Sequence, residues 1–240
     1  MELVTARKRS PAVAVMAKVP GKSLVKSRLH AALTAERATE LYRCFLLDRL
    51  DAVAALQGVS RVVAFTPDEA ERVIRELAPP GFELVAQRGA DLGERLSGLL
   101  TDLLERGHAG AIAIDSDSPT LPMTFVVEAA TMLADARCDV VLGPCDDGGY
   151  YLVGLRSSQP ALFAEIPWST DAVFTMTLDK ARGLGLTVHV LPRWFDVDTE
   201  GDLQRLHAEL SAGSPGPRRT HAFVAQLYAS GSRSDVELGA

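Results

Sequence analysis

The sequence predicts an α/β protein of one domain, with a mostly parallel sheet and helices on both of its faces. Two observations lead to this prediction. Short apolar runs recur along the chain, and longer segments with apolar residues at helical spacing separate them. This alternation is typical of strands that are joined by crossover helices. The 240 residues, 47% of them hydrophobic, are enough for one large core.

Seven apolar runs are predicted to be strands. The first, at residues 12–17, is apolar throughout, which indicates a strand buried on both faces. The run at 111–115 ends in an aspartate, and two prolines that follow prevent the strand from continuing. The remaining predicted strands are 62–65, 82–86, 139–142, 150–155 and 186–191.

The predicted helices lie between these strands. Segment 35–56 combines helical spacing with strong helix formers, so it is predicted to be a long helix. Thr66 and Glu69 predict a capping box for the next helix, and Thr199 and Asp202 predict one near the end of the chain. The other predicted helices are 92–106, 123–134 and 172–184.

The pattern predicts a domain over residues 11–210. A flexible segment, 1–10, is expected before it. Over 211–240 the composition shifts toward Ser, Gly and Pro, which predicts a linker, a short helix near 220–228 and a disordered tail. No apolar run approaches the roughly 18 residues that a membrane-spanning helix needs.

The net charge of −6 and the absence of a long Lys/Arg run argue against extensive nucleic-acid binding. Cys44, Cys138 and Cys145 are odd in number and scattered. They fit reduced thiols in the cytoplasm and not a disulfide framework or a zinc site, so we expect a cytoplasmic protein. The sequence leaves the oligomeric state open, a homodimer included.

A pair of aspartates, Asp115 and Asp117, ends the buried strand at 111–115. Ligands of open α/β sheets bind at this carboxyl edge. Residues i and i+2 of an extended chain point the same way, so both carboxylates can face one Mg²⁺ ion. The alternative is an Asp/Ser/Pro turn, in which Asp115 caps its own backbone.

A basic loop follows the first strand. Strand, glycine-containing loop and helix form a layout that binds phosphate, because backbone N–H groups and a helix N-terminus favour an anion. The alternative is a solvated basic loop. The candidate nucleotide-binding residues of this loop are Lys18, Gly21, Lys22, Lys26 and Arg28.

Two further carboxylates, Asp196 and Asp198, repeat the paired spacing at a strand end. The carboxyl ends of parallel strands share one edge, so this pair, the first pair and the basic loop can converge there. Cations and paired carboxylates at one place are what a metal-bound nucleotide phosphate chain requires. Asp147 lies in a glycine-rich turn, and the pattern does not decide whether it faces this place.

Seven motifs together resemble a bacterial transferase family that is found beside radical-SAM and selenium-domain genes and is usually labelled glycosyltransferase. That family is similar to the GT-A, or nucleotide-diphosphosugar transferase, fold, a Rossmann-like three-layer sandwich. The resemblance covers residues 11–210, and segment 22–29 also resembles 2-phospho-L-lactate guanylyltransferases. The motifs begin at Ala17, Lys26, Asp91, Asp115, Asp147, Ile166 and Asp196.

The resemblance implies roles for individual residues. Asp117 corresponds to the central metal ligand, and Asp198, with Asp196, to a second metal-binding element. Lys26 and Arg28 match cations on the nucleotide phosphates. In the family's loop, other residues separate the proline from the glycine, whereas here Gly21 directly follows Pro20. Asp91 and Gly93 are further nucleotide-binding candidates from a shared motif, although the pattern by itself favours Asp91 as a helix cap.

Two reactions use these residues with Mg²⁺ or Mn²⁺. In a nucleotidylyltransferase, a phosphorylated small acceptor attacks a nucleoside triphosphate, and the catalytic candidates are Lys26, Arg28 and Asp117. In a glycosyltransferase, a nucleoside-diphosphate sugar is the donor, and Asp147 or Asp171 is the base. The concentrated cations and the two carboxylate pairs favour the first reaction, whereas the family's label favours the second. A non-catalytic nucleotide-binding protein is a third interpretation.

Overall fold

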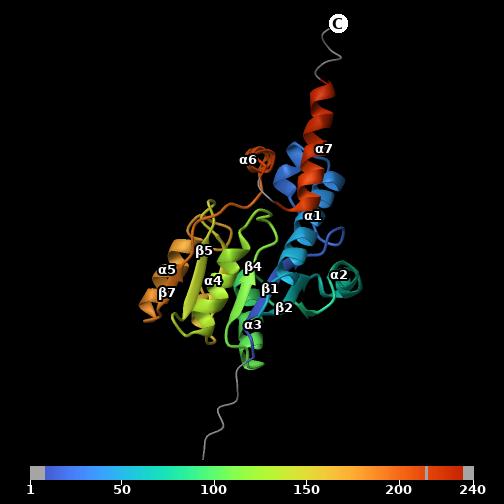
Figure 1. The fold of residues 1–240 in the computed structure, drawn as a ribbon. Helices are drawn as coiled ribbons and strands as arrows, with labels where there is room; N and C mark the ends of the chain where they lie inside the picture. The colour runs from blue at the N-terminus through green and yellow to red at the C-terminus, as the bar shows by residue number, and fades with distance from the viewer. Residues whose placement is uncertain (1–8, 214–215, 235–240) are drawn as a thin grey trace, which may run out of the picture.

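The computed structural model describes residues 9–213 and 216–234 and contains a seven-stranded sheet with the order β3-β2-β1-β4-β6-β5-β7 (Figure 1). Within these residues, β6 alone runs antiparallel to its neighbours β4 and β5. The predicted mostly parallel sheet is therefore confirmed. The strands are β1 Ala12–Lys18, β2 Ser60–Thr66, β3 Phe82–Ala86, β4 Ala111–Ile114, β5 Val140–Pro144, β6 Tyr150–Leu155 and β7 Val188–Val190.

Helices cover both faces of the sheet, because alternate residues of each strand point to opposite sides. Val13 and Val15 of β1 pack in one core cluster with α1, α2 and α4, whereas Ala12 and Ala14 pack in another with α3 and α5. The result is the predicted three-layer sandwich. The helices are α1 Ala35–Ala54, α2 Glu71–Leu77, α3 Leu92–Glu105, α4 Met123–Ala134, α5 Val173–Gly183, α6 Glu200–Ser211 and α7 Arg218–Ser234, with short 3₁₀ turns η1 Ser27–Ala31, η2 Asp68–Ala70 and η3 Pro160–Leu162.

A third core cluster lies beyond the carboxyl ends of the strands. It joins η1 and the first half of α1 to α6 and α7, and Figure 1 shows α7 running beside α1 and past the sheet. Phe45, Val197 and Val224 belong to this cluster and are buried. The site described below is built on this cluster.

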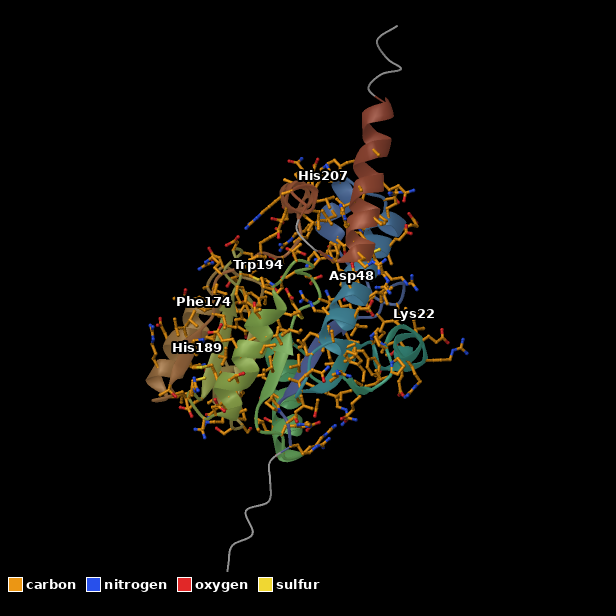
Figure 2. All side chains as sticks on the ribbon, in the orientation of Figure 1. Lys22, Asp48, Phe174, His189, Trp194 and His207 are labelled. Atoms are coloured by element: carbon orange, nitrogen blue, oxygen red, sulfur yellow. The ribbon has the colours of Figure 1, made fainter. Side chains whose placement is uncertain are left out.

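Helix α7 is longer than the short helix expected near 220–228, and it packs on the domain. Asp48 of α1, which lies where α7 begins, accepts hydrogen bonds from the backbone N–H groups of Arg219 (3.2 Å) and Thr220 (2.8 Å) (Figure 2). A helix start that is capped by a distant residue leaves no local sequence signal. The flexible segment expected at 1–10 and the tail expected up to 240 fall largely on residues 1–8 and 235–240, which lie outside the described residues.

The two predicted capping boxes have different outcomes. Thr199 and Asp202 form theirs at the start of α6, with N–H···O distances of 3.3 and 2.8 Å. Thr66 forms none, because it is the last residue of β2 and the following 3₁₀ turn begins at Asp68, so that Pro67 and not Thr66 occupies the cap position. No helix in the described part of the chain is long and apolar enough to cross a membrane.

Candidate functional site

A cavity of about 500 Å³ lies at the carboxyl ends of β1 and β4. Three segments that are far apart in the sequence meet there: the loop after β1, the turn after β4 and the segment before α6. The cavity is lined by both charges and apolar residues. Its charged residues are Lys18, Lys26, Arg28, Arg95, Asp115, Asp117 and Asp198.

Lys26 joins the two carboxylate elements. Its Nζ lies 2.7 Å from an oxygen of Asp117 and 2.7 Å from an oxygen of Asp198, and its side chain is 2% exposed. Burial would lower the pKa of Lys26, but the two carboxylates raise it above its usual value. The residue therefore stays cationic. Its backbone is left-handed, with φ +50°, a conformation that is uncommon outside glycine.

The two carboxylates that share Lys26 remain open to the cavity. The side chains of Asp117 and Asp198 are 39% and 36% exposed, and Lys26 occupies one oxygen of each. Arg28 lies 3.6 Å from the other oxygen of Asp198. Burial by itself would raise the pKa of Asp198, but Lys26 and then Arg28 outweigh it and lower the pKa.

Asp115 has different surroundings from Asp117. Ser118 Oγ donates to its Oδ2 at 2.5 Å, and Arg49 Nη2 lies 4.0 Å from its Oδ1, which has no hydrogen-bond partner among the residues that the structure describes. Burial is the main reason why the pKa of Asp115 rises to about 6, and Arg49 opposes that rise. Asp115 thus lines the cavity and also accepts a hydrogen bond from the turn, although from a serine hydroxyl and not from a backbone group as the alternative interpretation expected.

A buried hydrogen-bonded chain fixes the turn to the first strand. Ser116 Oγ donates to the carbonyl of Met16 at 2.9 Å and lies 2.9 Å from the hydroxyl of Tyr42. That hydroxyl accepts the backbone N–H of Lys18 at 3.0 Å. Tyr42 and Arg49 were not among the predicted site residues. They are polar and lie seven positions apart on the buried side of the predicted helix, but this pattern does not identify their distant partners.

Four predicted nucleotide-binding residues do not line the cavity. Gly21 and Lys22 are exposed in the loop after β1, and Lys22 is labelled in Figure 2. Asp91 caps α3 by accepting the N–H of Glu94 at 2.8 Å. Gly93 packs under an indole, since a Cβ there would lie 2.6 Å from Trp168 Nε1. Leu92 and Arg95 of the same motif line the cavity instead.

A second cavity of about 260 Å³ shares Arg28 and Asp198 with the first. It contains Asp147, whose carboxylate accepts the N–H of Gly149 at 2.8 Å, and Asp196. Burial, followed by the charges of Asp147 and Asp198, raises the pKa of Asp196 to about 7. The structure thus places Asp147 and Asp196 in this second cavity, next to the first and not inside it.

Comparisons with known proteins agree with this fold. A family model described as "Uncharacterized protein conserved in bacteria (DUF2064)" matches residues 49–170, slightly more than half of the chain. A structure from Desulfovibrio desulfuricans G20, described as a candidate nucleotide-diphospho-sugar transferase, is 32% identical with a TM-score of 0.84, over 92% of this chain and 96% of that one. No curated protein matches the sequence.

Two more distant structures show the same fold. One is CMP:2-keto-3-deoxy-manno-octonic acid synthetase complexed with CTP, at 12% identity and a TM-score of 0.54, over 85% of this chain and 99% of that one. The other is 4-diphosphocytidyl-2C-methyl-D-erythritol synthase from Anaerococcus prevotii DSM 20548, at 12% identity and 0.55, over 85% and 96%. The predicted GT-A-like fold is confirmed, whereas the association with radical-SAM genes and the likeness to guanylyltransferases stay predictions.

Proposed function

This chain belongs to the DUF2064 family of uncharacterized proteins conserved in bacteria, and we propose that it is a nucleotidylyltransferase. The reaction joins a nucleoside triphosphate to a phosphorylated small acceptor and releases pyrophosphate. Relatives that are described as transferases and synthetases support an enzyme that uses nucleotides. The choice of nucleotidylyl transfer rests on the site itself.

One observation carries the proposal: Lys26 Nζ lies 2.7 Å from the carboxylates of both Asp117 and Asp198. This contact unites a basic loop and two acidic elements at the edge of the sheet where α/β proteins bind ligands. A triphosphate carries more negative charge than the diphosphate of a sugar nucleotide, so it gains more from several cations. The cations that line the cavity are Lys18, Lys26, Arg28 and Arg95.

A divalent cation fits Asp117 and Asp198. Each is a hard oxygen ligand, is partly exposed to the cavity and has one oxygen that Lys26 does not occupy. When bound there, Mg²⁺ or Mn²⁺ supplies Lewis-acid stabilisation of charge on the phosphates.

The protein's own groups position the reactants. An oxygen of the acceptor phosphate forms a bond to the α-phosphorus, and the bond from that phosphorus to the β-phosphate oxygen breaks. The electron pair leaves with pyrophosphate, whose charge Lys26 and Arg28 stabilise. An acceptor phosphate is already an anion, so this reaction needs no protein base.

Glycosyl transfer is the second candidate. The description of the Desulfovibrio structure favours it, and so does the position of Asp147. Asp147 is exposed in the second cavity, which shares Arg28 and Asp198 with the first. A carboxylate there is suited to accept a proton from an acceptor hydroxyl.

A thermal-shift panel tests the choice. It contains Mg²⁺ with each nucleoside triphosphate, and separately with the common nucleoside-diphosphate sugars. A ligand at a hundredfold excess over its dissociation constant stabilises the fold by about 2.7 kcal/mol. We expect a shift with one triphosphate and a smaller one with every sugar nucleotide. A shift with a sugar nucleotide alone would establish the second candidate, and no shift with either class would refute both.

A further inference from the structure

Three side chains with metal-ligating atoms face one another beside the second cavity. The sulfur of Cys145 and one carboxylate oxygen each of Asp147 and Asp196 all lie within 4.8 Å of one another. The turn after β5 contributes Cys145 and Asp147, and the segment before α6 contributes Asp196. Among the described residues, the ion pairs of Lys26 are to Asp117 and Asp198 and to none of these three.

The two carboxylates of this group lack a cation between them. Asp196 forms no ion pair, and Asp147 accepts only the N–H of Gly149, as far as the described residues show. The nearby guanidinium of Arg205 pairs with Asp146 at 2.7 Å, and that of Arg28 lies beside Asp198. Two carboxylates at this separation repel each other when both are charged, so either a cation or a proton must lie between them.

The thiol adds an independent indication. Cys145 is 4% exposed, and within the described part of the chain its sulfur makes no hydrogen bond. Cys145 packs in the first core cluster, and its sulfur lies within 4.8 Å of one oxygen of each carboxylate. The buried sulfur, unpartnered among the described residues, therefore faces the two oxygens. Cys138 is equally buried, but its neighbour Asp139 is paired with Arg156.

The backbone holds the three ligands in place. Cys145 and Trp194 form a parallel bridge, in which Trp194 donates to Pro144 and Asp146 donates to Trp194, both at 3.0 Å. The turn after Cys145 includes Gly148 at φ +89°, where an added Cβ would lie 2.2 Å from the carbonyl oxygen of Asp171. The group is therefore built on paired main chain and a tight turn.

We propose that Cys145, Asp147 and Asp196 bind a transition-metal ion such as Zn²⁺, at a site separate from Asp117 and Asp198. Thiolate ligands select zinc-like metals over Mg²⁺, whose preferred ligands are oxygens. Three protein ligands leave one tetrahedral position open, as in catalytic zinc sites. Binding releases the proton of the thiol.

Cobalt titration of the full-length protein tests this proposal, because Co²⁺ bound to a thiolate gives a sulfur-to-metal charge-transfer band in the near ultraviolet. We expect one equivalent of Co²⁺ to produce the band, Zn²⁺ to abolish it and excess Mg²⁺ to leave it unchanged. Cys145→Ser should remove the band. Asp196→Asn keeps the thiol and should weaken Co²⁺ binding by at least about tenfold.

Matched variants separate this site from others. Cys44→Ser and Cys138→Ser remove the other two thiols and should keep the band, and so should Asp117→Asn. Thermal unfolding of each variant, including Cys145→Ala, checks that a lost band does not result from loss of the fold. A wild-type protein without the band, or a folded Cys145→Ser variant that retains it, overturns the proposal. Because the readout is metal binding, it does not depend on which nucleotide reaction the enzyme catalyses.

Discussion

At the scale of single residues, Lys26 compensates the negative charge of two carboxylates in the first cavity. Asp117 and Asp198 come from segments 81 positions apart in numbering. A backbone hydrogen bond from Val197 to the Asp117 carbonyl (3.0 Å) joins the two segments, and the buried ammonium group of Lys26 joins the two carboxylates. Without it, two carboxylates would face each other at the edge of the sheet. Lys26 therefore has a structural effect in the free protein in addition to its proposed role in binding phosphates.

The first prediction concerns the variant Lys26→Met, which keeps the length of the side chain and removes the charge. We expect it to lower the free energy of unfolding at pH 7 by about 2 kcal/mol, less than for a fully buried pair because the carboxylates are partly exposed. The deficit should shrink at acidic pH, where protonation of one carboxylate removes the repulsion. Urea unfolding at several pH values measures it.

Arg28→Met is the matched control for this prediction. The Arg28 side chain is 66% exposed, so its loss should cost little stability while weakening triphosphate binding. Equal stability of Lys26→Met and the wild type would show that the ammonium group does not hold the two carboxylates together.

The second prediction concerns Asp117→Asn, which keeps the size of the side chain and removes one charge from the proposed metal site. Turnover should be lost with the fold intact, and Mg²⁺ should no longer increase the thermal shift that a triphosphate produces. EDTA should have the same effect on the wild type. Asp146→Asn, in the other cavity, should retain the Mg²⁺ effect. A variant at 117 that keeps full Mg²⁺-dependent turnover would remove Asp117 from the metal site.

At the scale of elements, the sheet was accessible from the sequence because each strand is a separate apolar run. The helical spacing of apolar residues likewise predicted α3 and α4. The paired aspartates could also be found, since their spacing is local. Tyr42 and Arg49 could not, because their partners Ser116 and Ser118 are about seventy residues away and only the fold brings them together.

The start of α7 shows the same limit, because the residue that caps this helix is distant in the sequence. Local capping signals predict a helix start only when the cap is adjacent, as at Thr199. Asp48 caps α7 from another helix, so the composition of the segment suggested a linker. The expected capping box at Thr66 did not form because β2 extends to that residue and the cap position falls on Pro67.

The third prediction concerns Asp139, which directly precedes β5 and joins it to Thr187, before β7, and to Arg156, directly after β6. Hydrogen bonds from Thr187, at 2.6 and 3.0 Å, and then from Arg156 lower the pKa of Asp139 from 3.8 to about 2. A lowered pKa stabilises the fold above the unfolded-state value and loses that effect as the pH falls through the folded-state value. The contribution at neutral pH is about 2 kcal/mol.

The variant Asp139→Asn measures this contribution. The difference in unfolding free energy between the wild type and the variant should be constant above pH 5 and shrink toward pH 2. Asp135→Asn, whose partner is Arg137 on the surface, should show little difference at any pH. A constant difference for Asp139→Asn down to pH 2 would contradict the assignment of its pKa.

At the scale of the whole molecule, the third core cluster supports the chemistry. Phe45 lies 5.8 Å below the ammonium group of Lys26, and Val197 separates Asp196 from Asp198. Both residues pack in the same cluster as Phe223 and Val224 of α7. Helix α7 therefore completes the core on which the first cavity is built, although none of its described side chains lines that cavity.

The fourth prediction follows from this packing. Phe223 is 7% exposed, and Phe223→Ala should lower the free energy of unfolding by about 3 kcal/mol. If α7 is part of one cooperative unit, the urea midpoint falls while the slope stays unchanged. His221→Ala, at an exposed position of the same helix, should leave the midpoint in place. An early separate transition in Phe223→Ala, with nucleotide binding unaffected, would instead make α7 an appendage, because the cluster would then hold Lys26 and Asp198 in place without it.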